Sequence, residues 1–384
     1  MATIRKQFKP STQLVSTAQV HAAPRLKFSS QTIIAHTQPG LEAVVISEAV
    51  SRIAGVTELG RRVVPDRSGL AVFDAPDPRL LARLRCAEDL FAMVGYARGI
   101  ATDEHGLEAA RRLARAAPFV EQALLSRVQV TAGSRAGYRL SFRVLVRVVG
   151  DHQFRRVDLA RALERGIGER GDHRWRAQAD GEVEFWATLL QDELILALRL
   201  SDDRMRQRQY KVAHFPGSLR PSVAAAMAWL SQPQDDDVVV DPLCGAGTIL
   251  IERAHLGRYR MLLGGDHNEA VLAAARENIG PRYKPIELRL WDATALPLRD
   301  ASVTRVIVNL PWGRRIGSHS DNRRLYPRLM GEFRRVLVPG GRLVMLSGEG
   351  GLLRESIARS DLTPSAVLPV TILGTPARIV VCAI

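Results

Sequence analysis

VVVDPLCGAGT, residues 238–248, is the stretch that decides the fold. Its apolar, β-branched start predicts a buried strand, and its glycines predict a tight turn. The apolar residues 249–254 predict the helix that follows. Gly245 and Gly247 would let the backbone approach a ligand, because neither residue carries a Cβ. A lone Gly-x-Gly is equally compatible with an ordinary turn, so other residues must decide between the two interpretations.

Further strand candidates alternate with helical segments along the C-terminal half. Short apolar runs separated by helices of ten or more residues predict a doubly wound α/β domain with a mostly parallel sheet covered on both faces. Ligands bind such sheets at the carboxyl ends of the strands. The candidate strands are 238–241, 261–266, 286–292, 303–309, 342–347 and 377–383.

Acids follow the second and third of these strands. Asp266 lies 19 residues beyond Gly247, where a carboxylate can accept hydrogen bonds from both hydroxyls of a ribose. A nicotinamide site would share this pattern, but position 250 is leucine and not the small residue that pyrophosphate binding requires. The expected ligand is therefore a nucleoside without phosphates. Asp292 would accept from an adenine amino group or be a solvated acid, and its register with Asp266 favours the first.

The fourth strand ends in Asn309-Leu310-Pro311-Trp312. A polar amide and a rigid proline at the ligand edge are hard to explain by packing, because a buried amide without partners costs a few kcal/mol. This loop therefore predicts a functional site beside the glycine turn.

The same loop carries a family resemblance. Asn309-Leu310-Pro311-Trp312 resembles the N/D-P-P-Y/F/W motif of class I methyltransferases that act on exocyclic or amide nitrogens. With DPLCGAGT (241–248), FPGSLRP (215–221), and GRRIG (313–317) followed by Leu325-Tyr326, the C-terminal half resembles the THUMP-containing tRNA guanine-N2 methyltransferases. The resemblance implies a Rossmann-like domain with a mostly parallel seven-stranded sheet. It also implies S-adenosylmethionine as methyl donor, S-adenosylhomocysteine as product and no metal.

The resemblance further implies roles for individual residues. Asn309, Pro311 and Trp312 would be catalytic: Asn309 would orient the target amine, and Trp312 would stack on the base, a contact worth ~1–3 kcal/mol. Asn309 carries no charge and would not act as a general base. The expected cofactor-binding residues are Ser218, Arg220, Asp241, Leu243, Gly245, Gly247, Thr248, Asp266, His267, Asp292, Ala293 and Asn309.

The N-terminal half matches the family less literally. YRLSFRV (138–144), followed by DHQF (151–154) and a helix, resembles the THUMP RNA-binding module; an unrelated α+β domain is the alternative. The expected division is a flexible basic tail at 1–30, a ferredoxin-like domain at 31–99, THUMP at 100–200, an exposed linker at 201–217 and the methyltransferase domain at 218–384. The acid-free tail is also compatible with a targeting segment.

The net charge of +14 points to a partner with a phosphate backbone. Only five of the 54 basic residues are lysine, so the alternative is that a GC-rich genome has filled solvated surfaces with arginine. Three cysteines show no metal or redox spacing, and no stretch is apolar enough for a bilayer. A cytoplasmic monomer that binds RNA, most plausibly tRNA, is expected. Arg314, Arg315, Arg323 and Arg324 are the expected RNA-binding residues, which would hold phosphates. They belong to a set of arginines after the catalytic loop, of which some would only line a solvated helix face: Arg314, Arg315, Arg323, Arg324, Arg328, Arg334 and Arg335.

The expected reaction is methylation of a guanosine N2 in tRNA, and the acceptor stem near position 6 comes from the resemblance alone. Two alternatives remain open. One is a methyltransferase for another amine, such as guanine in ribosomal RNA or adenine N6, because the loop chemistry would be the same. The other is a non-catalytic RNA-binding assembly factor.

Overall fold

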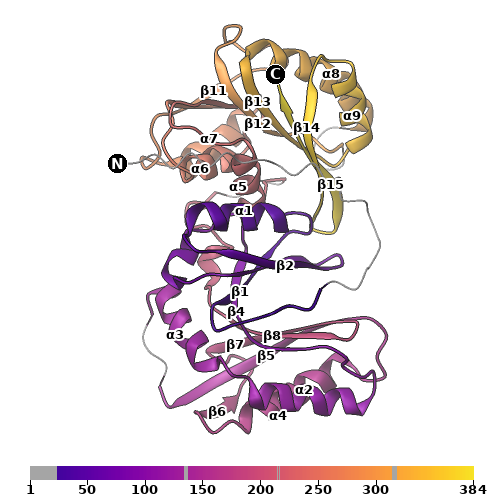
Figure 1. Cartoon of the computed structure of the whole chain (residues 1–384). Helices are drawn as coiled ribbons and strands as arrows, with labels where there is room; N and C mark the ends of the chain where they lie inside the picture. The colour runs from indigo at the N-terminus through magenta and orange to yellow at the C-terminus, as the bar shows by residue number, and fades with distance from the viewer. Residues whose placement is uncertain (1–23, 134–136, 214, 216, 314–317) are drawn as a thin grey trace.

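The computed structural model describes residues 24–133, 137–213, 215, 217–313 and 318–384. Each half of the chain is built on its own sheet, eight-stranded in the N-terminal half and seven-stranded in the C-terminal half. Helix α1 of the first half lies against α5 of the second (Figure 1). No helix of the described residues is long and apolar enough to cross a membrane.

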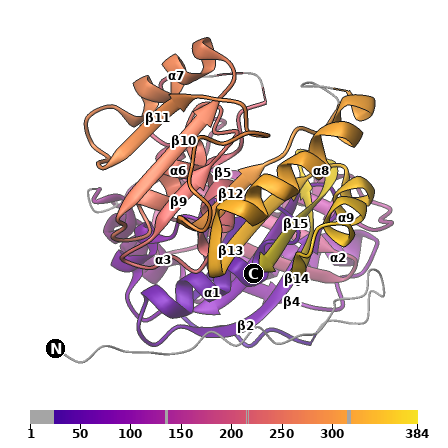
Figure 2. The same cartoon turned by 90° about the horizontal axis from the view of Figure 1, so that it is seen from above.

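The C-terminal sheet has the strand order β11-β10-β9-β12-β13-β15-β14, which Figure 2 shows from above. The first five strands are parallel and β15 is antiparallel to both its neighbours. The predicted α/β, Rossmann-like architecture with a mostly parallel seven-stranded sheet is confirmed. Its strands are β9 (Val238–Asp241), β10 (Met261–Asp266), β11 (Ile286–Leu290), β12 (Val303–Asn309), β13 (Leu337–Ser347), β14 (Thr363–Ile372) and β15 (Thr375–Ala383).

Helices cover this sheet on both faces. Val239 and Ile307 belong to a core with α5, α6 and α7, whereas Val240 and Val308 belong to a core with α8 and α9. Successive side chains of each strand thus point into two different apolar cores, as expected when both faces of a parallel sheet are covered. The helices are α5 (Pro221–Leu230), α6 (Thr248–Ala254), α7 (Glu269–Ile279), α8 (His319–Val336) and α9 (Gly350–Ala358).

Strand β14 is not among the strands that the sequence predicts. It contains Pro364 and Pro369, and proline cannot donate to a strand ladder, so its sequence does not read as a strand. The strand forms because it lies at the edge of the sheet, paired with β15 alone. An edge strand has one side free of partners, where a missing N–H costs little.

The N-terminal sheet has the strand order β2-β3-β1-β4-β8-β7-β5-β6. Pairing of β4 with β8 makes it continuous across the expected boundary between residues 99 and 100, and the division of this half into two domains stays a prediction. Its strands are β1 (Thr32–Thr37), β2 (Thr57–Val64), β3 (Ser68–Asp74), β4 (Asp89–Ala97), β5 (Arg139–Val149), β6 (Arg174–Ala177), β7 (Val183–Leu190) and β8 (Glu193–Arg199); its helices are α1 (Glu42–Arg52), α2 (Glu104–Ala116), α3 (Val120–Thr131) and α4 (Arg156–Gly168), with short 3-10 helices η1 (Pro78–Arg83) and η2 (Asp203–Met205).

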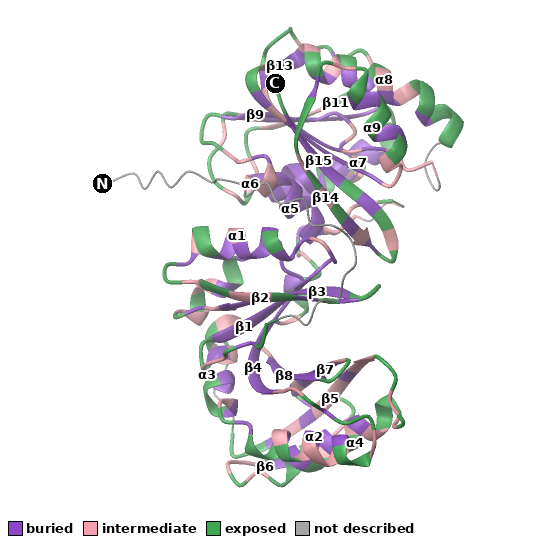
Figure 3. Cartoon of the chain, turned by 45° about the vertical axis from the view of Figure 1, so that its right-hand side comes forward, coloured by how far each residue is buried: buried purple, intermediate pink, exposed green. Residues whose placement is uncertain are grey.

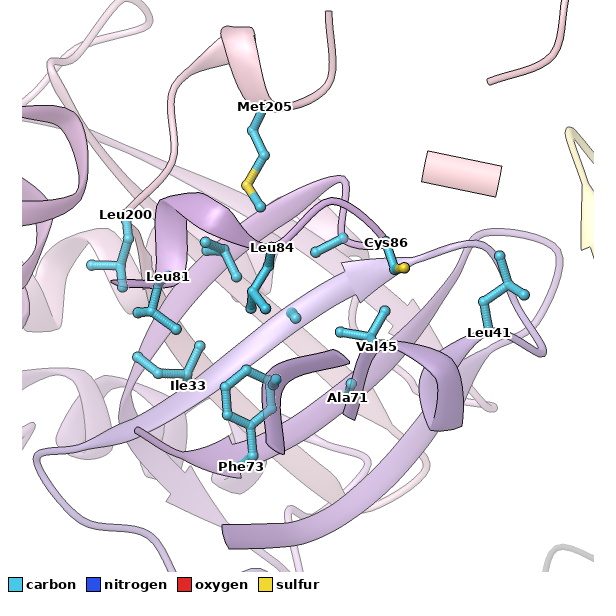
Figure 4. Close-up of a cluster of buried hydrophobic side chains, with 14 of the residues drawn as sticks. Ile33, Leu41, Val45, Ala71, Phe73, Leu81, Leu84, Cys86, Leu200 and Met205 are labelled. Carbon is cyan, nitrogen blue, oxygen red and sulfur yellow. The ribbon is translucent and has the colours of Figure 1, made fainter. Parts of the chain in front are cut away.

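The segment 201–217 is not the exposed linker expected from its polar composition. Met205 is buried and, with Leu200, reaches into the core of the N-terminal half beside Leu81 and Leu84 (Figure 4). Tyr210 is buried as well, and its hydroxyl donates to Glu252 in α6 over 2.7 Å. Buried apolar and aromatic groups interleaved with arginines therefore fix this segment to both halves.

Part of the expected N-terminal tail is also packed. Leu26 is buried, its N–H donates to the Tyr96 hydroxyl, and the Pro24 carbonyl accepts from Arg62. The flexible-tail prediction is therefore wrong for these residues. The rest of the expected tail, residues 1–23, lies outside the described residues.

Helix α5 joins the two halves. It is apolar around its whole circumference, which is typical of a helix buried on all sides. Pro221 occupies its first turn, where a missing N–H is harmless. One side packs on the sheet and another on α1, where the Trp229 indole N–H donates to the Ser47 hydroxyl over 3.1 Å; α5 stands out as buried in Figure 3.

Candidate active site

The glycine turn and the Asn309 loop end neighbouring strands of the same sheet. Strand β9 pairs in parallel with β12, with Val239 opposite Arg305 and Val240 opposite Val306. Asp241 and Asn309 therefore leave the sheet side by side at its carboxyl edge. The chain continues from β9 to β10 on one side, while β12 lies on the other, so this is the point where the strand order reverses. Open α/β sheets bind their ligands at such a point.

The backbone of the turn requires its glycines. Gly245 and Gly247 have φ angles of +52° and +78°, which residues with a Cβ rarely adopt. A Cβ on Gly245 would meet no described atom within 4 Å, so the turn faces open space at that position. The Gly245 N–H donates to the Asp266 carboxylate over 3.2 Å, which ties the turn to the end of β10.

Asp241, at this edge, and Ser218, in the segment before α5, are polar groups that are buried with few partners. Asp241 accepts only from the Leu243 N–H, at 3.3 Å, among the described residues. Burial, reinforced by the charge of Asp266, raises its pKa well above the usual value. The Ser218 hydroxyl is buried without a hydrogen-bond partner in the described chain. A ligand with polar groups facing Ser218 and Asp241 would satisfy both, so these residues fit a bound nucleoside cofactor.

The other expected cofactor residues surround this turn. Asp292 is exposed at the end of β11, and bonds from the Thr294 N–H and hydroxyl, each 2.8 Å, lower its pKa. His267 is exposed beside Asp266, Ala293 and Thr248 are buried, and Leu243 is half-buried. Arg220 instead points to the N-terminal half, where it pairs with Glu88 at 3.2 Å.

Trp291 locks the ends of β9, β10 and β11 together. Its indole N–H donates to the Pro242 carbonyl over 3.0 Å, and its ring lies against Gly265. A Cβ on Gly265 would lie 1.9 Å from the ring, which is far inside contact distance. The absence of that Cβ is what lets the indole close over the strand ends.

Gly265→Ala is expected to destabilise the domain by about 1–3 kcal/mol, because the new methyl group displaces the Trp291 ring. Urea unfolding of the purified variant measures this change. Gly331→Ala is a matched control, since a Cβ there meets nothing within 4 Å. Equal unfolding midpoints for the two variants would show that Trp291 does not hold the strand ends as described.

The catalytic loop is internally bonded. The Asn309 side-chain oxygen accepts from the Trp312 indole N–H over 3.1 Å. Trp312 is half-buried and lies against Gly348, where a Cβ would approach the ring to 2.7 Å. The expected catalytic residues Asn309 and Trp312 are thus brought together, with one lone pair of the amide oxygen left free.

Pro311 contributes through its carbonyl group. That oxygen accepts from the Tyr326 hydroxyl at 2.7 Å and from the Asn322 amide at 2.9 Å. Tyr326 also bonds to Ser347 at 2.8 Å, and Asn322 donates to Glu349 at 2.6 Å. These four residues, from α8 and the end of β13, fix the loop from behind.

Sequence reasoning did not assign these supporting residues. A signal was present: Asn322 and Tyr326 lie four residues apart and continue the buried stripe of α8 formed by Leu329, Met330 and Phe333. Polar side chains on the inward side of a helix need partners, which points to a loop behind it.

Tyr326→Phe is expected to lower kcat of methyl transfer about 3–10-fold, since it removes one of the two donors that hold the Pro311 carbonyl, a bond worth roughly 1 kcal/mol. KM for the methyl donor should stay unchanged, because Tyr326 does not reach the glycine turn. Steady-state kinetics separate these constants. A change in KM alone, with kcat unaltered, would contradict the positioning role.

The arginines after the loop divide into different groups. Arg323 and Arg328 are exposed on α8, and Arg324 pairs with Asp321 at 3.2 Å. Arg335 bonds to Asp300 at 2.6 Å and Glu332 at 2.8 Å and so anchors α8. Arg334 is exposed in the last turn of the helix; Arg314 and Arg315 lie outside the described residues.

Two cavities lie away from this edge. One of about 180 Å³ is lined by residues of the N-terminal half, including Arg199 and Glu184. The other, of about 590 Å³, lies beside Asp235 and Asp236 ahead of β9, at the opposite edge of the C-terminal sheet. No group of three or more His, Cys, Asp or Glu side chains suited to a metal occurs in the described ranges.

The C-terminal half of the chain is similar to known methyltransferases. Residues 208–375 match the family model described as RMKL-like, methyltransferase domain. The chain is 34% identical over 223 residues to tRNA (guanine(6)-N(2))-methyltransferase THUMP3 of Mus musculus, covering 54% of this chain and 43% of that protein. It is 29% identical over 328 residues to tRNA (guanine(6)-N2)-methyltransferase of Thermus thermophilus, covering 84% and 91%. The chain thus spans less than half the length of its mammalian relatives.

Solved structures share the fold over nearly the whole chain. The crystal structure of TrmN from Thermus thermophilus matches with a TM-score of 0.74 and 24% identity, covering 92% of this chain and 99% of that one. SMU.472, a putative methyltransferase complexed with SAH, matches with a TM-score of 0.67 and 15% identity, covering 91% and 97%. The expected fold is confirmed by these matches, and S-adenosylmethionine stays the expected cofactor. The similarity to methyltransferases thus covers residues 208–375 by the family model and more than nine-tenths of the chain by the fold.

Proposed function

We propose that this chain transfers a methyl group from S-adenosylmethionine to the exocyclic N2 of a guanosine in tRNA. The relatives named above act on guanine N2, which supports the substrate. The observation that carries the proposal is the position of Asp241 and Asn309, which end adjacent parallel strands. A cofactor on the glycine turn and an amine at the Asn309 loop would therefore share one edge.

The bound cofactor would supply an electrophilic methyl group on a sulfonium. Residues of this chain would hold its nucleoside part. Asp266 would accept from the ribose hydroxyls, and Asp292 from the adenine amino group. Ser218 and Asp241 are buried groups short of partners, which supports a polar ligand between them. Gly245 leaves that ligand room.

The catalytic loop would orient the amine. Guanine N2 is a poor nucleophile until its geometry is fixed, so positioning is the main requirement. Asn309 can still accept one amine hydrogen, since Trp312 uses only one of its lone pairs. The Pro311 carbonyl already accepts two bonds, which favours the Leu310 carbonyl as the second acceptor. The remaining surface of the Trp312 ring would stack on the base.

Nucleoside mass spectrometry of tRNA from cells with and without the gene tests this function. N2-methylguanosine should disappear from one tRNA position on deletion, and sequencing of the fragment tests whether that position is 6. Loss of methyl groups only from ribosomal RNA or from adenine N6 would select the rival amine, and no loss anywhere would support the assembly-factor alternative. The cytoplasmic location and the monomeric state stay predictions.

A further inference from the structure

The eight-stranded sheet of the N-terminal half is strongly curved, so that side chains of β5 reach β3. The Arg147 side chain in β5 donates to the Ser68 hydroxyl at the start of β3 over 2.6 Å, although four strands lie between β5 and β3 in the sheet. With neighbouring strands ~4.8 Å apart, a flat sheet would separate them by ~24 Å. Figure 3 shows this curvature, with β3 and β5 on facing sides of the concave surface.

Arginines surround one end of the concave surface. We call this set the arginine rim: Arg67, Arg143, Arg147, Arg199 and Arg206. Three of its members are neutralised by carboxylates. Arg199 pairs with Asp89 at 2.7 Å, Glu184 at 3.2 Å and Asp203 at 2.9 Å, Arg206 pairs with Asp89, and Arg143 pairs with Glu184.

The other two arginines have no carboxylate partner among the described residues. Arg147 stacks on the Trp186 ring, 4.8 Å from its centroid, and its one hydrogen bond goes to Ser68. Burial, then the charges of Arg67 and Arg206, lower its pKa, while Asp89 and Glu88 oppose this only partly. Arg67 is exposed; its backbone N–H donates to the Val64 carbonyl over 3.1 Å, but its side chain forms no hydrogen bond or ion pair within the described chain. Two guanidinium groups thus stand close together without neutralisation.

This arrangement suits an external anion. Like charges held near each other repel, and Asp89 and Glu88 offset that repulsion only in part. The Arg147 guanidinium lies over the Trp186 indole, and its planar set of donors matches the oxygens of a phosphate. His36, buried beside Trp186, does not add to the charge, because burial and the nearby arginines hold its pKa well below the usual value.

The rim borders the methyltransferase domain. Glu88, next to Asp89, accepts from Arg220 at 3.2 Å and from the Ser222 hydroxyl at 3.0 Å, both at the start of α5. Ser218, one of the expected cofactor residues, lies two residues before Arg220. An anion on the rim would therefore lie where the N-terminal half meets the entrance to the catalytic domain.

We propose that Arg67 and Arg147 of the arginine rim form a binding site for consecutive phosphates of the RNA backbone. The inference rests on the proposed function in taking RNA as the substrate. The site would hold the strand through its phosphates without reading its sequence. Trp186 acts here as a positioning residue, because the Arg147 guanidinium lies over its ring.

The test is the salt dependence of tRNA binding by the double variant Arg67→Gln, Arg147→Gln. Each lost phosphate contact reduces the slope of log Kd against log salt by about one. We expect the slope to fall by about two and Kd to rise at least ~10-fold at moderate salt. Binding of S-adenosylhomocysteine should stay unchanged. Arg161→Gln, an exposed arginine on the outer side of α4, is the matched control.

If Arg147→Gln perturbs the fold, Arg67→Gln alone still tests the site, because Arg67 is exposed and unpaired in the described structure; its slope should fall by about one. A slope and Kd equal to those of Arg161→Gln would overturn the proposal. Methyl transfer by the wild-type protein separates the two claims. Transfer with unaltered RNA binding in the variants refutes the rim alone, whereas salt-dependent rim binding without transfer refutes the proposed function alone.

Discussion

Replacing Asn309 by alanine is expected to lower methyl transfer by at least ~100-fold, the effect typical of removing one aligned polar group from an active site. The amide oxygen is the acceptor that the loop offers to the target amine, and its loss also releases the Trp312 indole. Binding of S-adenosylhomocysteine should change less than ~3-fold, because Asp241, Gly245 and Asp266 remain in place. Single-turnover kinetics and calorimetry measure the two effects.

The matched control for this variant is Ser302→Ala, at the other end of β12, where the hydroxyl donates only to the Arg299 carbonyl. It should transfer methyl groups at the wild-type rate. Full activity of Asn309→Ala would refute the role assigned to the loop. Loss of cofactor binding in that variant would instead move Asn309 into the cofactor site.

Replacing Asp266 by alanine is expected to weaken cofactor binding by about 100-fold. Its carboxylate accepts from the Gly245 N–H at 3.2 Å and from the Asn268 N–H at 3.1 Å, so it orders the glycine turn, and in the proposed site it would also accept from the ribose hydroxyls. Charge-assisted hydrogen bonds contribute about 1.5–3 kcal/mol each, and two of them account for a change of this size. Calorimetric titration with S-adenosylhomocysteine measures it.

An exposed acid on the neighbouring strand provides the comparison. Glu287 in β11 pairs only with Arg289, at 2.7 Å, among the described residues. Glu287→Ala should bind the cofactor as the wild type does. If Asp266→Ala kept wild-type affinity, the ligand would not lie on the turn that begins at Asp241.

The strands of the catalytic domain were predictable because each core strand is a short β-branched run between helices. β9, β10 and β12 begin and end where the sequence indicates. β14 was not predictable, since its two prolines mask it and only pairing with β15 makes it a strand. The buried segment around Tyr210 was hidden by its arginines, whose partners lie in α6 and in the N-terminal half.

In the candidate site, too, some features could be predicted from the sequence and others could not. Asp241, Asp266 and Asn309 end consecutive or adjacent strands, so a local pattern and the rule for sheet edges brought them together in prediction. Contacts across the fold were not accessible. Nothing in the sequence aligns Tyr326 with Pro311 or Glu88 with Arg220, because these pairs depend on helix packing and on docking of the two halves.

The arginine rim shows the limit of composition. A charge of +14 indicates a phosphate-bearing partner without saying which arginines would meet it. Most basic side chains near the rim are neutralised by carboxylates, and only the curvature of the sheet leaves Arg67 and Arg147 without one. That curvature follows from the packing of eight strands and not from any local run of residues.

The most direct test of the central claim is a crystal structure of this protein with S-adenosylhomocysteine bound. We predict that the adenosine of S-adenosylhomocysteine lies between Asp266 and Asp292, with its sulfur atom beside the Asn309 loop. A cofactor bound in either of the two cavities away from this edge, or on the glycine turn with its sulfur facing away from Asn309, would contradict it.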